Sequence, residues 1–236
     1  MLEFGVRGQE LSMNSSGNSF QFSTMDITSP LIEEYCEAHT SPEGELLYRL
    51  FRETHLHGVK PRMISGHLQG RFLAMVSRLI QPVHALEIGT YTGYSALCLA
   101  EGLAPDGILD TIEVDEELEE IITRYIGQSP YKDRIHLHIG DAYQLVPRFD
   151  CKWDLVFIDA EKRGTREFYE MLLPRMRKGG LMLIDNMLWS GKVVEEGGHH
   201  DLDTQAIMEF NDYVQHDERV SNVLLPLRDG IMMVMC

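Results

Sequence analysis

The chain has 236 residues, 44% of them hydrophobic and 25% charged, which suits one globular domain with a buried core rather than two full-sized domains. Its 21 basic and 37 acidic residues give a net charge of −16, which argues against a nucleic-acid partner, because affinity for phosphate backbones comes from lysine and arginine. No apolar run is long enough to cross a membrane, and four widely spaced cysteines favour free thiols in the cytoplasm.

The N-terminal 24 residues are rich in Ser, Asn and Gly and lack periodicity, so we expect a flexible leader there, native or added in cloning. A single domain should follow over residues 25–236. Its first part, within 30–80, is expected to be helical, because apolar residues repeat at helical spacing over 30–57 and again over 66–80.

From residue 84 onward the pattern alternates between short apolar strands and amphipathic helices. The expected strands cover 84–88, 108–114, 134–139, 153–158, 180–184, 220–227 and 231–235. The expected helices cover 94–103, 116–126, 166–173 and 204–215, and a turn at Arg228-Asp229-Gly230 joins the last two strands into a hairpin. Repeated strand–helix units predict an α/β fold with a mostly parallel sheet, helices on both faces, and a ligand site at the carboxyl ends of the strands.

A glycine-containing loop, GTYTG at 89–93, joins the first expected strand to a helix. Gly89 and Gly93 would let the backbone turn sharply and approach a ligand closely. The spacing is GxxxG rather than the GxGxxG that cradles a pyrophosphate, so the loop favours S-adenosylmethionine over a dinucleotide. Glu87 could bind the amino group of its methionine moiety, and Ser95 its carboxylate at the start of a helix.

Acidic residues also end the next two expected strands. Glu113 stands where an acidic residue commonly accepts the ribose hydroxyls, and Asp141 could accept a hydrogen bond from the adenine amino group. Either carboxylate could instead be a solvated strand end. Glu87 is more informative, because a carboxylate within an apolar strand is costly unless something pairs with it.

The fourth and fifth expected strands end in Asp159 and in Asp185-Asn186. Neighbouring strand ends should bring these side chains together, and two carboxylates repel each other unless a cation lies between them. Oxygen ligands favour Mg²⁺, Ca²⁺ or Mn²⁺. Lys162, three residues after Asp159, could act as a base that helps a hydroxyl oxygen attack the sulfonium methyl group. Alternatively, Asp159 caps the next helix and Lys162 pairs with a surface acid.

These segments resemble the caffeoyl-CoA and catechol O-methyltransferases, especially their small bacterial members. The resemblance covers residues 63–236 and rests on Gln69-Gly70, LEIGTYTGYSALCLA at 86–100, IEVD at 112–115, GDA at 140–142, FIDAEK at 157–162, IDNMLWSGKVV at 184–194 and the terminal RDGIMMV. It implies a Rossmann-like fold, a seven-stranded sheet with an antiparallel last strand, and a homodimer.

The resemblance also implies roles for individual residues. Contacts with S-adenosylmethionine are expected from Ser65, Glu87, Gly89, Tyr91, Ser95, Glu113, Asp141, Ala142 and Asp159. Metal ligation is expected from Asp159, Asp185 and Asn186, with Lys162 and Asp159 as the catalytic residues. Arg163-Gly164-Thr165 replaces an Asn-Tyr pair common among relatives, and Glu161 replaces an Asp, so plant-type acyl-CoA specificity does not carry over.

We therefore expect a metal-dependent O-methyltransferase that uses S-adenosylmethionine and a catechol-like small molecule. Methylation of a hydroxylated uridine in tRNA is an alternative within the same family, disfavoured by the charge of −16. An NAD-dependent oxidoreductase is disfavoured by the GxxxG spacing and by Asp185-Asn186. A binding module without catalysis is disfavoured because Lys162 accompanies all three expected metal ligands.

Overall fold

The helical N-terminal part divides into three helices. The computed structural model describes residues 27–58, 60–195 and 200–236, so the expected leader at 1–24 lies outside it. Helix α1 covers Pro30–Ala38, α2 covers Glu45–His57 and α3 covers Gly66–Ile80. The helical spacing over 30–57 therefore belongs to two helices, separated by a segment whose last residue, Gly44, has a φ of 84°, a backbone conformation that glycine adopts readily.

Seven strands form one sheet: β1 (His84–Ile88), β2 (Ile108–Glu113), β3 (Ile135–Ile139), β4 (Trp153–Ile158), β5 (Met176–Asp185), β6 (Ser221–Leu225) and β7 (Ile231–Met235). Their order is β3-β2-β1-β4-β5-β7-β6. The strands from β3 to β5 are parallel neighbours, whereas β7 is antiparallel to both β5 and β6. The expected seven-stranded sheet with an antiparallel last strand is confirmed. Strand β5 begins four residues before the expected position 180.

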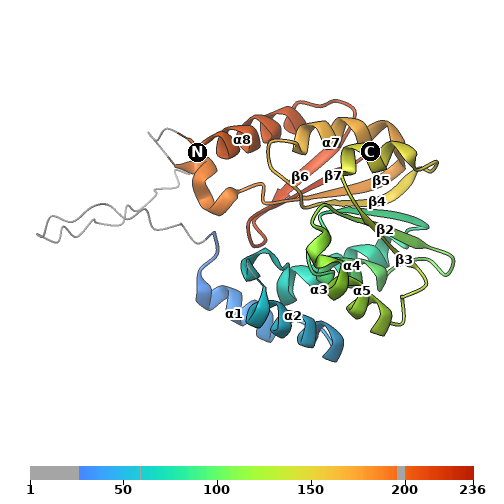
Figure 1. The fold of residues 1–236 in the computed structure, drawn as a ribbon. Coiled ribbons are helices and arrows are strands. Elements are labelled where there is room, and N and C mark those ends of the chain that lie inside the picture. The colour runs from blue at the N-terminus through green and yellow to red at the C-terminus, as the bar shows by residue number, and fades with distance from the viewer. Residues whose placement is uncertain (1–26, 59, 196–199) are drawn as a thin grey trace, which may run out of the picture.

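Helices cover both faces of the sheet (Figure 1). Helix α3, α4 (Tyr94–Ala100) and α5 (Glu119–Gln128) lie on one face, with α1 and α2 outside them, and α7 (Thr165–Leu172) and α8 (Leu202–Gln215) lie on the other. Successive strand residues point to opposite faces, so Leu155 and Phe157 of β4 join the core beneath α3 and α4, while Val156 and Ile158 join the core beneath α7 and α8. Among the described residues, no helix is long and apolar enough to span a bilayer.

The connections place several chain segments at one edge of the sheet. From β1 the chain continues outward to β2 and β3, whereas β4 lies on the other side of β1 and leads to β5. The carboxyl ends of β1 and β4 therefore mark a topological switch point, where sheets of this kind bind ligands. Because Asp185 at the end of β5 pairs with Ile231 at the start of β7, the turn before β7 reaches the same edge.

Two further elements at this edge were not expected from the sequence. Helix α6 (Ala142–Leu145) is a short helix that follows β3, and η5 (Trp189–Val194) is a 3₁₀ segment that follows β5. Left-handed backbone conformations at Asn186, Trp189 and Ser190, with φ of 65°, 46° and 53°, bend the chain sharply after β5. Both elements lie next to the strand ends at which the predicted site residues cluster.

Candidate functional site

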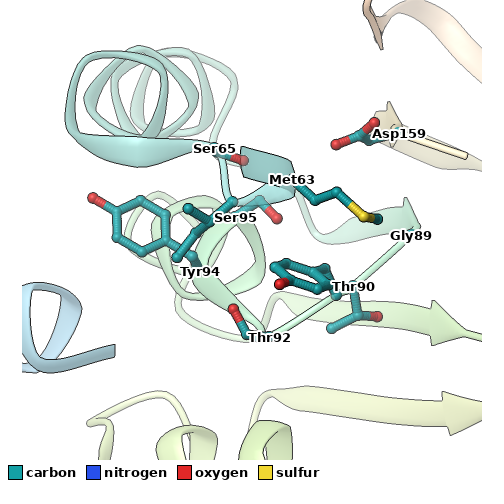
Figure 2. A pocket seen from close by; sticks show the side chains of 10 residues that line it. Met63, Ser65, Gly89, Thr90, Thr92, Tyr94, Ser95 and Asp159 are labelled. Carbon is teal, nitrogen blue, oxygen red and sulfur yellow. The ribbon is translucent and has the colours of Figure 1, made fainter. Parts of the chain in front are cut away.

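A cleft of about 980 Å³ opens at the carboxyl edge of the parallel strands. This volume lies within the range of small-molecule sites in proteins. The predicted site residues in its lining are Gly89, Tyr91, Glu113, Asp141, Ala142, Asp159, Lys162, Asp185 and Asn186. Ser65 and Ser95 line a smaller hollow that shares Met63, Gly89, Tyr91 and Asp159 with the cleft (Figure 2). The structure therefore brings together eleven of the twelve predicted residues, all except Glu87, in the linings of these two cavities.

The loop at 89–93 passes close to the end of β4. Gly89 has a φ of 98°, and a Cβ atom at this position would overlap the backbone carbonyl oxygen of Asp159. Gly93, with a φ of 91°, precedes α4, so Ser95 lies in the first turn of that helix. Figure 2 shows Ser95 on α4 and Ser65 before α3 at one side of the hollow and Asp159 at the other. The loop thus lies between Ser65 and Ser95, which were predicted to bind the cofactor, and Asp159, which was predicted to be a catalytic residue.

Glu87 is fully buried at the end of β1. Its Oε2 accepts a hydrogen bond of 2.5 Å from the Thr111 hydroxyl, whereas its buried Oε1 has no partner among the described residues. Burial raises the pKa of Glu87 to about 8, against the lowering effect of the Ser95 and Thr111 hydroxyls. An unpaired carboxyl oxygen in this position requires a donor, and an amino group of a ligand would supply one.

Glu113 fixes the backbone around the cleft. Its Oε2 accepts from the backbone N–H of Tyr91 at 2.7 Å, and its Oε1 accepts from the N–H groups of Val114 and Asp115 at 2.9 and 3.0 Å. A carboxylate has about four lone-pair positions, so little capacity remains for ribose hydroxyls. The role of Glu113 in holding the loop could not be read from its position in the sequence.

Asp141 and Asp159 differ in how they meet the following helix. Asp141 caps α6, because its Oδ1 accepts from the Tyr143 N–H at 2.9 Å, and it also lines the cleft. Asp159 does not cap α7, whose N-cap residue is Gly164. The helix-cap alternative considered for Asp159 is therefore wrong.

Lys162 joins the ends of β4 and β5. Its ammonium donates to the Asn186 side-chain oxygen at 2.5 Å and to Asp159 Oδ1 at 3.3 Å. The Lys162 side chain is 11% exposed and that of Asp159 is 24% exposed, so this ion pair belongs to the cleft rather than to the open surface. The alternative that Lys162 pairs with a surface acid is therefore wrong as well.

Asp185 is 4% exposed and accepts two hydrogen bonds. Gln69 donates to its Oδ2 at 2.6 Å, and the Asn186 N–H donates to its Oδ1 at 2.7 Å. Burial and, after it, the charge of Asp159 raise the pKa of Asp185 to about 7, against the lowering effects of the Gln69 hydrogen bond and of the charges of Lys162 and Arg228. In the described ranges, no group of three or more His, Cys, Asp or Glu side chains is arranged to hold a metal ion. The expected cation, for which Asn186 would be the third ligand, stays a prediction.

Four further residues surround this cluster, and none of them was predicted from the sequence to belong to the site. They are Gln69 on α3, Trp189 in η5, and Arg228 and Asp229 in the β6–β7 turn. Asp229 accepts from the Ser190 N–H and from Asn186 Nδ2, the latter at 3.3 Å. The Trp189 ring centroid lies 6.0 Å from Lys162 Nζ. The expected antiparallel last strand was a signal for Arg228 and Asp229. The turn before such a strand lies at the carboxyl ends of the neighbouring parallel strands, where the site was expected.

Two of the residues at which the sequence is expected to depart from the family pattern, Glu161 and Arg163, lie in the cleft wall. Arg163 Nε donates to Asp203 Oδ1 at 2.7 Å, and both side chains line the cleft together with Glu161. Arg163 follows Lys162, and Asp203 lies in α8. This ion pair therefore joins the segment after β4 to α8 at one side of the cleft.

Comparisons with known proteins agree with this geometry. A protein-family model described as O-methyltransferase matches residues 37–236. A caffeoyl-CoA O-methyltransferase from Populus kitakamiensis is 31% identical over 173 residues, which cover 69% of this chain and 74% of the relative.

Solved structures give the same result. The O-methyltransferase from Bacillus cereus in complex with SAH has a TM-score of 0.78 and 26% identity, with 87% of this chain and 96% of that chain covered. The O-methyltransferase TomG from Streptomyces achromogenes, in complex with SAM, has a TM-score of 0.77 and 26% identity, with 87% and 95% covered.

Proposed function

The chain belongs to the O-methyltransferase family, and we propose that this S-adenosylmethionine-dependent enzyme methylates one hydroxyl of a vicinal dihydroxy aromatic small molecule with the help of a divalent cation. Relatives of this family act on small hydroxylated substrates. The main support for the proposal is that Asp159, Lys162, Asp185 and Asn186 lie together in one cleft. Several of the predicted cofactor residues line the same cleft.

The donor set at the ends of β4 and β5 fits a hard divalent cation. Asp159, Asp185 and Asn186 offer oxygen atoms only, which is the chemistry that Mg²⁺, Ca²⁺ and Mn²⁺ prefer. Burial and, after it, the nearby charge of Asp159 raise the pKa of Asp185, and a bound cation would favour its ionised form. A cation bound by these three residues would supply Lewis acidity to the acceptor hydroxyl and leave positions for both vicinal oxygens.

Lys162 is proposed to act as the base. In its amine form, Lys162 Nζ accepts the proton of the acceptor hydroxyl, and the oxygen lone pair forms a bond to the methyl carbon of S-adenosylmethionine. The bond from that carbon to sulfur breaks, and its electron pair stays on sulfur, so the products are a methyl ether and S-adenosylhomocysteine. Asp159 and Asn186 orient Lys162 for this step, because both side chains accept hydrogen bonds from Nζ.

The methyl donor is proposed to lie over the Gly89 loop. Glu87 Oε1, which lacks a partner among the described residues, would accept from the amino group of the donor. Ser65 and Ser95 would bind its carboxylate, the latter in the first turn of α4, where the helix dipole favours an anion. Asp141 and Ala142 would face adenine. Bound in this way, the donor would present its sulfonium methyl group toward Asp159 at the end of β4.

The deciding experiment measures binding and transfer in one preparation. S-adenosylmethionine is titrated by calorimetry, and methyl transfer to 3,4-dihydroxybenzoate is assayed with Mg²⁺ and with excess EDTA. We expect binding and EDTA-sensitive transfer. The matched control acceptor is 3-hydroxybenzoate, which has one hydroxyl and should react at least about 10-fold more slowly if two vicinal oxygens are bound.

The outcomes separate the parts of the proposal. Transfer that is insensitive to EDTA would refute the role of the cation. Equal rates with both acceptors would refute selection for vicinal hydroxyls. Absence of binding to both S-adenosylmethionine and S-adenosylhomocysteine would refute the proposed placement of the methyl donor.

A further inference from the structure

Gln69, on α3, is a fully buried amide. A buried amide needs a donor for its oxygen and an acceptor for its nitrogen. Arg228 Nη1 donates to Gln69 Oε1 at 3.0 Å, and Gln69 Nε2 donates to Asp185 Oδ2 at 2.6 Å. A guanidinium can only donate and an ionised carboxylate can only accept, so these two partners fix the orientation of the amide.

The amide keeps Arg228 and Asp185 apart while linking them. A direct ion pair between arginine and aspartate tends to be bidentate and would occupy both carboxylate oxygens. Gln69 uses only one position on Oδ2, and the Asn186 N–H uses one on Oδ1. The carboxylate of Asp185 is thus held in place by two hydrogen bonds, while its remaining lone pairs have no partner among the described residues.

The same guanidinium also holds the chain segment that precedes α3. The two hydrogens of Arg228 Nη1 are shared among Gln69 Oε1 and the backbone oxygens of Ile64, at 2.8 Å, and Ser65. Nη2 donates to the backbone oxygen of Arg62 at 3.3 Å. This segment, residues 62–65, contributes Met63, Ile64 and Ser65 to the hollow on the cofactor side. The Arg228 side chain, which extends from the β6–β7 turn, therefore contacts groups at both ends of the site.

We propose that Arg228 and Gln69 are positioning residues that connect the two halves of the site: Arg228 fixes segment 62–65 at the methyl-donor side, and the Gln69 amide fixes the Asp185 carboxylate at the acceptor side. The Gln69 half rests on the proposed function, because it concerns Asp185 as a cation ligand. The Arg228 half requires only that the methyl donor contacts segment 62–65. Each residue would act through the group that it holds, segment 62–65 or the Asp185 carboxylate.

The test uses Arg228→Lys and Gln69→Met in the full chain, with S-adenosylhomocysteine and Mn²⁺ as separate calorimetric probes. Lysine keeps the charge but loses the fork that reaches several carbonyl oxygens. We expect Arg228→Lys to raise the Kd for S-adenosylhomocysteine about 10-fold and to speed hydrogen exchange of the peptide covering 61–67 by about the same factor. We expect Gln69→Met to raise the Kd for Mn²⁺ about 10-fold and to leave the Kd for S-adenosylhomocysteine within about threefold.

Matched variants control for general loss of stability. Arg175→Lys changes another guanidinium that donates to backbone carbonyls, those of Val146 and Phe149, away from the cleft. Ser77→Ala removes another buried hydrogen bond of α3, to Leu99 O. Both controls should bind both probes as the unsubstituted protein does.

The outcomes decide each half separately. The Arg228 half would be overturned if Arg228→Lys changed neither the Kd for S-adenosylhomocysteine nor the hydrogen exchange of residues 61–67. It would also be overturned if Arg175→Lys changed both quantities as much as Arg228→Lys does. Unchanged Mn²⁺ binding in Gln69→Met would overturn the Gln69 half. If the unsubstituted protein binds no Mn²⁺, the cation part of the proposed function fails and the Gln69 half fails with it, while the Arg228 half is still decided by the other two measurements.

Discussion

The ammonium of Lys162 donates to the side-chain oxygen of Asn186 at 2.5 Å, across the ends of two neighbouring strands. Lys162 follows β4 and Asn186 follows β5, so this contact exists only because the two strands are parallel neighbours in register. The contact holds Nζ beside the Asp159 carboxylate, which is 3.3 Å away. The contact therefore fixes the position of Lys162. Among the described residues, this is the only basic side chain that donates hydrogen bonds to proposed metal ligands at the ends of both β4 and β5.

Replacement of Lys162 should impair the chemical step. Loss of a positioned base costs about 100- to 10,000-fold in rate, so we expect kcat to fall by this factor in Lys162→Ala. Lys162→Arg should fall as far, because a guanidinium keeps the charge but does not accept a proton at neutral pH. The Kd for S-adenosylhomocysteine should change little. Initial-rate kinetics and calorimetry on each variant provide the measurement.

Lys192 supplies the control for this experiment. Its Nζ lies 5.9 Å from the same Trp189 ring but pairs with Asp201 at 2.8 Å and is 39% exposed. Lys192→Ala should keep kcat within about twofold, as is usual for exposed pairs. A Lys162→Arg variant with full activity would show that the positive charge matters and that proton transfer to Nζ does not.

Removal of the proposed cation should act through Asp159. Asp159→Asn keeps the shape of the side chain but removes the charge that draws a cation, so we expect EDTA-sensitive activity to fall at least about 100-fold. Asp203→Asn is the matched control, because Asp203 also lines the cleft but pairs with Arg163. Activity is measured over a range of Mg²⁺ concentrations. Equal Mg²⁺ dependence in both variants would contradict the ligand role of Asp159.

The buried carboxyl of Glu87 should make stability depend on pH. With a pKa of about 8 in the folded protein and near 4.5 in the unfolded chain, Glu87 binds more protons when folded between these values. The free energy of unfolding therefore falls as pH rises from about 4.5 to about 8. Asp185, with a pKa raised to about 7, adds to the same slope. Glu87 faces the charges of Asp159 and Glu113, both of which favour its protonated form.

Glu87→Gln tests this prediction, because glutamine is neutral at every pH in this window. The urea concentration at the unfolding midpoint should decrease as the pH is raised from 5 to 8 in the unsubstituted protein. The decrease should be smaller in Glu87→Gln. Urea unfolding followed by circular dichroism at several pH values gives both slopes. Parallel slopes in the two proteins would mean that Glu87 does not titrate as the buried position implies.

The loop at Gly89 should tolerate no side chain. Gly89→Ala combines a φ of 98° with overlap of the new Cβ and the Asp159 carbonyl oxygen, so we expect a loss of about 2–4 kcal/mol in stability and weaker binding of S-adenosylhomocysteine. Gly127→Ala is the matched control: Gly127 lies in α5 with nothing within 4 Å of an added Cβ. This variant should gain about 0.5–1 kcal/mol, because alanine is the better helix former. Thermal unfolding of both variants decides the comparison.

Local sequence pattern determined the strands, the larger helices and the positions of the strand-end residues. Apolar periodicity and glycine spacing act over a few residues, so β1, the Gly89 loop and α4 could be predicted without knowledge of the rest of the chain. Parallel strands share an edge, which is why the approach of Asp159 and Asn186 was also predictable. The break between α1 and α2 was not predicted, because helical spacing of apolar residues continues across it. The early start of β5 was not predicted either, because the charged residues Arg177 and Lys178 follow Met176.

The tertiary structure alone decided how the site is held together. Gln69, Asp185 and Arg228 come from a helix, a parallel strand and a hairpin turn that lie far apart in the sequence, and their contacts depend on how α3 and β7 pack against the sheet. The sequence likewise does not tell whether a carboxylate after a strand caps the next helix, as Asp141 does, or leaves the N-cap position to another residue, as Asp159 does. These differences arise from burial and from the three-dimensional arrangement of donors, which short-range patterns do not encode.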